Sequence, residues 1–364
     1  MDIVKNERVF INNVKMNMRE SPIGWKLFAI LSKELSQNLW YNGYNYDKYL
    51  QVSTERLSGM AKYPQWSYSQ SRANMFDECL RKYYFHYYGS HNGWNEKLGS
   101  EEQVQAYRLK QLRNFYLLFG DLAHRMCESA LRQWDESKSS PRPEFLDTTM
   151  RKLLNDAYIQ SRDLEGWMRN PKHHMMLSEI YYGDDTLNSR IATIKQRQEE
   201  CVRHLYHNKT WQEITGSRVN ILEIEKWDTM ILFDTKVYVK MDLLYRKEDG
   251  TVVIVDWKTG REDDFSDQLY LYASYVQEKY NMPLENIQIR VEYLVTGEHQ
   301  EYSVTREDIV KVEQNIGRYI EEMRSCLDDD YYNRPKPESY FTAMPSPRKC
   351  KECNFREICK DRAV

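Results

Sequence analysis

The sequence predicts an α/β protein in which helices surround a sheet of mainly antiparallel strands. Helical periodicity dominates the first part of the 364 residues, whereas alternating apolar and polar residues, rich in Val and Ile, begin at Val219. The composition is 41% hydrophobic and 29% charged, which suits a globular chain long enough to bury a large core. Helices followed by strands and then by further helices predict a mixed α/β (α+β) fold.

The composition also restricts the environment and the partners of the chain. No apolar stretch is long enough to span a bilayer, and the first residues lack the basic start and apolar core of a signal peptide. The net charge of −3 argues against non-specific coating of nucleic acid but allows a local basic groove. We therefore expect a cytoplasmic, intracellular protein with no membrane partner.

Three helical regions are predicted before the strands begin. Residues 1–66 form an extension in which Ser21 and Pro22 are suited to start a helix. We expect the strongly charged residues 135–215 to form a helical insert. The predicted helices lie at residues 69–88, 101–134 and 145–210, with a loop at residues 89–99.

Strands and two further helices are predicted from Val219 onward. Asp249 and Gly250 indicate a hairpin turn between the second and third strands. Thr305 and Asp308 resemble a capping box that opens the last long helix. The predicted strands lie at residues 219–227, 230–246, 251–259 and 287–295, and the helices at residues 265–280 and 305–326.

The densest chemistry in the sequence follows two neighbouring strands. Asp242 is placed at the end of one strand, and Asp256 and Lys258 at the end of the next. Residues i and i+2 of a strand point to one face, so Asp256 and Lys258 share a face that Asp242 can reach. Two adjacent carboxylates predict a Mg²⁺ or Mn²⁺ site. An isolated Asp-x-Lys is more often a surface ion pair, but the apolar strand before Asp256 favours an active site.

These motifs resemble those of the RecB-like branch of the PD-(D/E)XK nucleases. The Asp-Trp-Lys-Thr-Gly segment at residues 256–260 is followed by Gln268-x-x-x-Tyr272 and preceded by Gly120-x-x-x-His124. The family start is matched by Ser69, Ser71, Arg72, Phe76, Cys79, Lys82, Tyr83 and Tyr84. The resemblance covers residues 67–364 in order and implies a restriction-endonuclease-like core with a mixed central sheet. Val239 departs from it, because the family often has Gly three residues before the first catalytic Asp.

The resemblance implies a role for each matching position. Its catalytic and metal-binding residues are Asp242 and Asp256 as ligands, His124 as an additional ligand, Lys258 as water-orienting base or electrostatic stabiliser, and Glu225 in support. An imidazole ligand would favour Mn²⁺. Gln268 and Tyr272 would steer DNA or brace the site. Taken alone, His124 would more often be a core histidine, and plain core packing is an equal alternative for Tyr272.

Four of the seven cysteines have a spacing that indicates a metal site. Cys350, Cys353 and Cys359 cluster at the C-terminus, and Cys79 lies far upstream. Spacing alone permits structural zinc or an iron–sulfur cluster. The resemblance to the AddB nuclease and the CRISPR-associated spacer-acquisition nuclease implies a [4Fe–4S] cluster that staples residues 345–364 to the first nuclease helix. Cys127, Cys201 and Cys326 are predicted to be core or bystander thiols.

The sequence therefore predicts a nuclease domain at residues 67–364 after an extension of unknown role. The expected function is metal-dependent hydrolysis of DNA phosphodiesters, with exonuclease action on single-stranded or end-containing DNA in repair, recombination or antiviral defence. No Walker A motif is present, so any helicase, like any CRISPR or defence protein, would be a separate partner. The alternative is a catalytically idle DNA-binding or scaffold subunit of a helicase–nuclease or CRISPR-adaptation complex. RNA remains open as a substrate.

Overall fold

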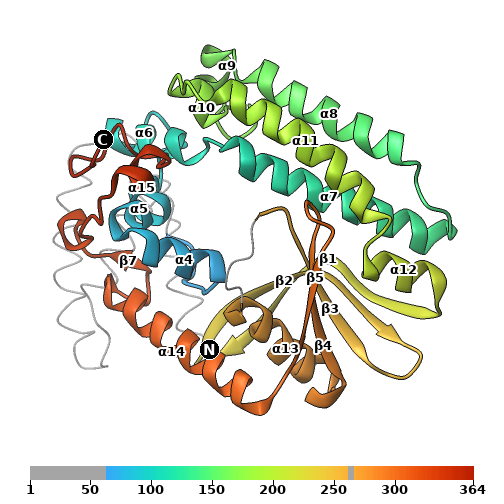
Figure 1. Cartoon of the computed structure of the whole chain (residues 1–364). Helices are drawn as coiled ribbons and strands as arrows, with labels where there is room; N and C mark the ends of the chain where they lie inside the picture. The colour runs from blue at the N-terminus through green and yellow to red at the C-terminus, as the bar shows by residue number, and fades with distance from the viewer. Residues whose placement is uncertain (1–62, 261–265) are drawn as a thin grey trace, which may run out of the picture. The chain divides into compact units, whose positions relative to one another are not determined.

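A five-stranded mixed sheet with helices on both faces forms the centre of the structure (Figure 1). The computed structural model describes residues 63–260 and 266–364, so the helix predicted after Ser21 lies outside the described residues. The strand order is β1-β2-β3-β4-β5. The strands are β1 (Val219–Leu232), β2 (Thr235–Lys247), β3 (Val252–Lys258), β4 (Ile287–Tyr293) and β5 (His299–Ser303).

The strand directions confirm the predicted mixed α/β class. β3 and β4 are parallel, whereas the other neighbouring strands are antiparallel. The parallel pair requires a crossover, which is supplied by helix α13 (Ser266–Tyr280). β3 is buried along its whole length up to Trp257, as expected for an inner strand covered on both faces.

Each face of the sheet packs against its own set of helices. Val237, Val239 and Met241 of β2 belong to the core shared with α13 and α14 (Arg306–Ser325). The Val at position 239 is therefore accommodated within the core. Leu243 and Tyr245 belong to the opposite core, which the insert helices build. Those helices are α7 (Phe115–Ser137), α8 (Pro143–Gln160), α10 (Ser178–Tyr181), α11 (Leu187–Leu205) and α12 (Lys209–Gly216), whereas α9 (Leu164–Arg169) places Trp167 in a third, smaller cluster.

The prediction of one continuous helix at residues 69–88 is wrong, because the helix is interrupted at Cys79. α4 (Gln70–Glu78) and α5 (Leu80–Tyr84) are separated by Cys79, whose backbone is extended at φ −170° and ψ 120°. A π-helical turn, η2 (Phe85–Gly89), follows directly. Apolar periodicity continues across the break, which is why the sequence pattern does not reveal it.

The second predicted helix is also divided. α6 (Glu101–Lys110) ends before Leu112, and α7 begins after Asn114, whose side chain accepts a hydrogen bond from the Tyr116 backbone. An Asn at this position is a strong N-cap signal that the long-helix prediction overlooked. The charged segment predicted as helical at residues 145–210 is a series of separate helices.

Of the turns at the two ends of β2, one was missed by the sequence prediction and the other was predicted correctly. The prediction ended the first strand at Trp227, but β1 and β2 continue to a two-residue turn at Phe233 and Asp234. Both turn residues have positive φ, 50° and 52°, as a type I′ hairpin requires. The turn predicted at Asp249 and Gly250 is confirmed, with Gly250 at φ 90°.

The C-terminal part returns to the first helices through short elements. The capping box predicted at Thr305 and Asp308 is confirmed at the start of α14. The remaining elements are η3 (Leu284–Asn286), β6 (Leu327–Asp329), β7 (Arg334–Pro335), η4 (Glu338–Tyr340) and α15 (Pro347–Lys351).

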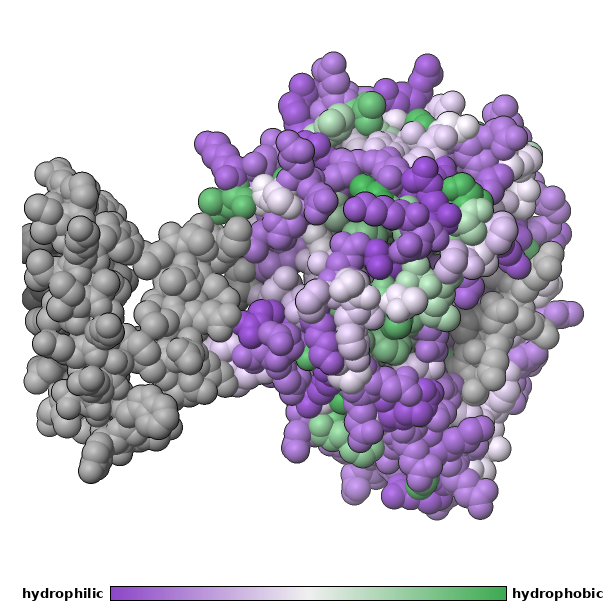
Figure 2. Space-filling model, turned by 90° about the vertical axis from the view of Figure 1, so that its left-hand side faces the viewer, coloured by the Kyte–Doolittle hydropathy of each residue, from purple (hydrophilic) through white to green (hydrophobic). Residues whose placement is uncertain are grey.

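The surface is mainly hydrophilic on the face drawn in Figure 2, where apolar residues form separate small patches. Within the described residues, no helix combines the length and the apolar character needed to cross a bilayer.

Candidate active site and metal centre

The two predicted carboxylates lie at the fork between β2 and β3, the point where the pairing of these two strands ends. The register between these strands runs from Arg246↔Val252 to Leu243↔Val255, so Asp242 and Asp256 come directly after the last pair. Asp242 thus lies inside β2 rather than at its end, which corrects the prediction. Its Oδ2 accepts a hydrogen bond of 2.7 Å from the backbone N–H of Trp257. Asp242 and Asp256 are both buried.

Glu225 enters the same region through an irregularity in β1. Its backbone φ is 49°, a left-handed conformation that is uncommon for a residue with a side chain. The regular pairing with β2 skips it, running from Ile224↔Leu243 to Lys226↔Met241. Its Oε1 is buried and makes no hydrogen bond to the described residues. A strained residue whose buried carboxylate oxygen has no hydrogen bond, and lies 3.6 Å from His124 Nδ1, is a candidate for a functional position.

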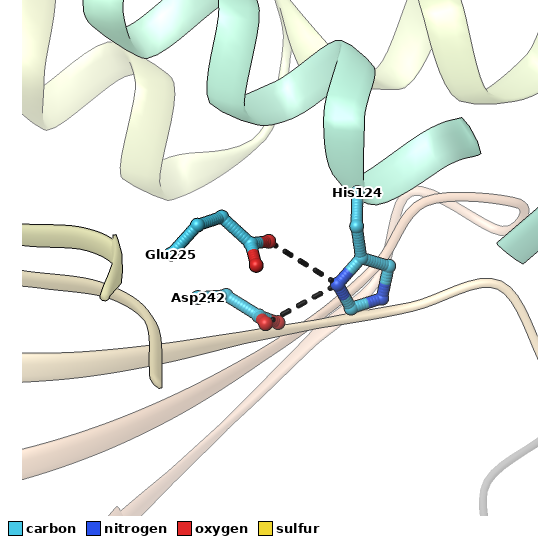
Figure 3. A group of neighbouring side chains, drawn as sticks. All are labelled: His124, Glu225 and Asp242. Atoms are coloured by element: carbon cyan, nitrogen blue, oxygen red, sulfur yellow. Dashed lines mark hydrogen bonds and ion pairs between the residues drawn. The ribbon is translucent and has the colours of Figure 1, made fainter. Parts of the chain in front are cut away.

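His124 approaches the carboxylates from helix α7 (Figure 3). Its Nδ1 lies 3.2 Å from Asp242 Oδ1 and 3.6 Å from Glu225 Oε1. One turn earlier, a Cβ at Gly120 would lie 3.3 Å from Thr259 Oγ1, so a larger residue would press on the segment after β3. His124, Glu225 and Asp242 each offer a ligand atom within 4.8 Å of the others.

The electrostatics show how tightly these charges interact. Burial, together with the neighbouring Asp242 carboxylate, raises the pKa of Asp256 to about 6. Burial acts in the same direction on Asp242, but the adjacent His124 outweighs it and holds the pKa of Asp242 below its ordinary value. Burial alone would lower the pKa of His124, yet Asp242 and Glu225 raise it well above 6.5. The site therefore concentrates negative charge that attracts a cation.

Lys258 and Asp256 form an ion pair at the end of β3. The Lys258 Nζ lies 2.7 Å from Asp256 Oδ2, and both side chains are largely buried. On α13, Gln268 Nε2 donates a 2.6 Å hydrogen bond to Tyr272 Oη. Burial, together with the charges of Asp256 and Asp242, raises the pKa of Tyr272. The two predicted positioning residues are therefore bonded to each other on one face of α13.

Lys240 is a residue that the sequence reasoning missed. Its ammonium forms an ion pair with the second carboxylate oxygen of Glu225. The available signal was its position two residues before Asp242, which can place both side chains near one site on an extended strand.

The donors present fit a hard divalent cation. Two carboxylates and one imidazole converge, and a carboxylate oxygen of Glu225 is buried without a hydrogen bond. Oxygen ligands suit Mg²⁺ or Mn²⁺, and an imidazole in the set favours Mn²⁺. Within residues 63–260 and 266–364, this is the one group of at least three His, Cys, Asp or Glu residues with ligand atoms so close together.

The four predicted cluster cysteines lie elsewhere, around one small cavity of about 30 Å³. Cys79 reaches the cavity because the helix breaks there, and its Sγ accepts a 3.4 Å hydrogen bond from the Met344 backbone. Cys350, Cys353 and Cys359 line the same cavity from the C-terminal segment. Their sulfur atoms are not gathered at single-ion distances in the described part of the chain.

Comparisons with known proteins agree with this architecture. Residues 67–360 match the sequence profile of the PD-(D/E)XK nuclease superfamily. No protein of curated function matches the sequence.

Two solved structures resemble parts of the chain. The crystal structure of SSO0001 shares 16% identity, with a TM-score of 0.26 over 51% of this chain and 82% of that one. A candidate exonuclease from Eubacterium rectale shares 12% identity, with a TM-score of 0.28 over 57% of this chain and 78% of that one. Similarities this weak indicate nothing about function.

Proposed function

The chain belongs to the PD-(D/E)XK nuclease superfamily, and we propose that it is a metal-dependent DNA nuclease acting at the His124, Glu225 and Asp242 group. The convergence of these three residues from α7, β1 and β2, beside the Asp256–Lys258 pair, is the observation that carries the proposal. Such a group costs folding free energy through buried charge and backbone strain, which a purely structural role would not require.

Each residue has a proposed task in phosphodiester hydrolysis. Asp242, Asp256 and His124 hold the divalent cation, with Glu225 in support. The bound cation would polarise the phosphate and lower the pKa of the attacking water. Lys258 orients that water through its ammonium hydrogens and offsets negative charge on the phosphate in the transition state. Gln268 and Tyr272 position the substrate strand.

The substrate class follows from the RecB-like motif order, as part of the same proposal. It is single-stranded or end-containing DNA, cut by an exonuclease to leave 5′-phosphate and 3′-hydroxyl ends. A helicase or a CRISPR or defence protein would be a separate partner.

The test is loss of end-labelled single-stranded DNA in Mg²⁺ or Mn²⁺, using wild type and Lys258→Ala purified side by side without oxygen. We expect wild type to cut, EDTA to stop cutting, and added Mn²⁺ to restore it. Lys258→Ala should cut about 10²- to 10⁴-fold more slowly, the range for a positioned proton-handling group. Lys247→Ala, a lysine of β2 that pairs with Glu213, is the matched control and should cut like wild type.

Two outcomes would contradict the proposal. Cleavage that persists in EDTA would remove the metal from the mechanism. Failure of wild type to cut single- or double-stranded DNA or RNA, while it still binds DNA, would support an idle scaffold subunit instead.

We also propose that the four cavity cysteines hold a [4Fe–4S] cluster. A tetrahedral zinc with Zn–S bonds of about 2.3 Å would require sulfur atoms within about 4 Å of one another. The four cysteines line one cavity, so they could supply the four thiolates that a [4Fe–4S] cluster requires. The cluster would fasten the C-terminal segment to the α4–α5 junction.

A further inference from the structure

The hairpin of β1 and β2 has one exposed face that the proposed mechanism does not use. The opposite face is buried, because Val237, Val239 and Met241 pack into the core with α13 and α14. The exposed face follows from the register, in which Trp227 pairs with Lys240, Thr229 with Tyr238 and Ile231 with Lys236. We call these residues the hairpin strip: Trp227, Thr229, Ile231, Lys236, Tyr238 and Lys240.

Large aromatic rings and lysines alternate along the hairpin strip. Trp227 is 68% exposed and Tyr238 is 38% exposed, and their ring centroids lie 6.3 Å apart. Lys236 Nζ lies 5.0 Å from the centroid of the Tyr238 ring, and Lys240 Nζ lies 5.5 Å from that of Trp227. None of the six residues is acidic, and Lys236 forms no ion pair with the described residues.

The hairpin strip leads directly to the proposed active site. Lys240 belongs to both, because its ammonium contacts the Trp227 ring and pairs with Glu225. Glu225 in turn lies beside His124. A strand of DNA that follows the strip from its tip would therefore arrive at the metal-binding carboxylates.

The tip of the hairpin contacts helix α14. A Cβ at Gly317 of α14 would lie 3.2 Å from the Phe233 ring, so the ring packs closely on this helix. Phe233 and Asp234 both adopt left-handed backbone conformations in the turn. Phe233 is 57% exposed, so this contact covers one side of its ring and leaves the rest at the surface.

We propose that the hairpin strip binds single-stranded DNA and guides it to the active site, an inference that rests on the proposed function. Exposed bases stack on Trp227 and Tyr238, and Lys236 attracts the phosphate between them, whereas the charge of Lys240 is paired with Glu225. Aromatic platforms combined with positive charge are the usual means of holding a single strand without sequence preference. Bases inside a duplex are already stacked on each other, so the strip selects single-stranded DNA.

Fluorescence anisotropy with labelled oligo(dT), in Ca²⁺ to prevent cleavage, tests the strip. We expect Trp227→Ala and Tyr238→Ala each to weaken binding about 5- to 100-fold, the range for loss of one stacked base. Trp227→Phe, which keeps a ring, should recover most of the affinity. Lys236→Gln should reduce the salt dependence of binding by about one phosphate contact. Phe145→Ala, which removes a 57% exposed ring from α8, is the matched control.

Two further probes separate this inference from the proposed function. An abasic oligonucleotide should bind wild type and Trp227→Ala equally, because it offers no base to stack. Hydrolysis of bis(p-nitrophenyl) phosphate in Mn²⁺, which needs the active site but no strand, should be the same in both proteins.

The outcomes are distinct. If Trp227→Ala and Tyr238→Ala bind oligo(dT) as tightly as wild type does, the strip does not bind DNA and its exposed rings suit a protein partner instead. If they lose binding equally for blunt duplex, the preference for a single strand is wrong. If wild type hydrolyses neither DNA nor the small phosphodiester, the proposed function fails, while the binding assay still decides the role of the strip.

Discussion

Asp242→Asn is expected to reduce DNA cleavage by at least about 10⁴-fold, because it removes one charged ligand from a site that depends on bound cation. Asp242 also uses both carboxylate oxygens. Its Oδ1 lies 3.2 Å from His124 Nδ1, and its Oδ2 accepts a hydrogen bond from the Trp257 N–H. Asparagine keeps an oxygen for the Trp257 N–H, so the fork between β2 and β3 should fold normally. Single-turnover cleavage of labelled DNA would measure the loss of activity, and Mn²⁺ titration by calorimetry would measure the loss of cation binding.

The control for Asp242→Asn is Asp249→Asn, a change of the same chemistry at the exposed turn between β2 and β3. Asp249 accepts a hydrogen bond from the Thr251 backbone and has no contact with the site. We expect this variant to cut DNA and bind Mn²⁺ like wild type. Cleavage by Asp242→Asn within tenfold of wild type would show that this carboxylate is not a ligand of the working cation.

Cys79→Ala is expected to abolish the proposed iron–sulfur cluster and to destabilise the domain. A cross-link from Cys79 to Cys350 closes a loop of about 270 residues, which in the chain-entropy treatment stabilises the folded state by about 5 kcal/mol. Iron and acid-labile sulfide analysis of protein purified without oxygen would measure the cluster. Urea unfolding followed by circular dichroism would measure the free energy of unfolding.

Cys326→Ala is the matched control for Cys79→Ala. Cys326 is buried in the core shared with α14 and does not line the cysteine cavity. This variant should retain full iron content and lose only the modest stability expected for a small core truncation. If wild-type protein contains one equivalent of zinc and no iron, the four cysteines hold a structural zinc ion and the cluster proposal is wrong.

Local parts of the candidate site could be predicted from the sequence, whereas its long-range contacts could not. Asp256 and Lys258 could be recognised because a polar pair interrupts a buried apolar strand, and the two-residue spacing fixes their common face. The approach of His124 to Asp242 spans more than one hundred residues of chain. No local pattern encodes that contact, so it could be expected only from the order of the family motifs.

The features that escaped prediction depend on tertiary contacts. The turn at Phe233 and Asp234 has no Gly to indicate its left-handed backbone, and Phe233 contacts α14 there. The helix break at Cys79 lies within continuous apolar periodicity, yet it turns the thiol toward the cysteine cavity. Lys240 was missed because its position two residues before Asp242 is a weak signal, and its ion pair with Glu225 depends on the pairing of β1 with β2.

The most direct test of the metal centre is anomalous diffraction from crystals of the protein soaked in Mn²⁺. We expect a manganese peak within ligand distance of His124 Nδ1 and of carboxylate oxygens of Asp242 and Asp256, and we expect Asp242→Asn crystals to lose it. A peak bound only elsewhere, in crystals of protein that still cleaves DNA with Mn²⁺, would contradict the assignment of this group as the nuclease active site.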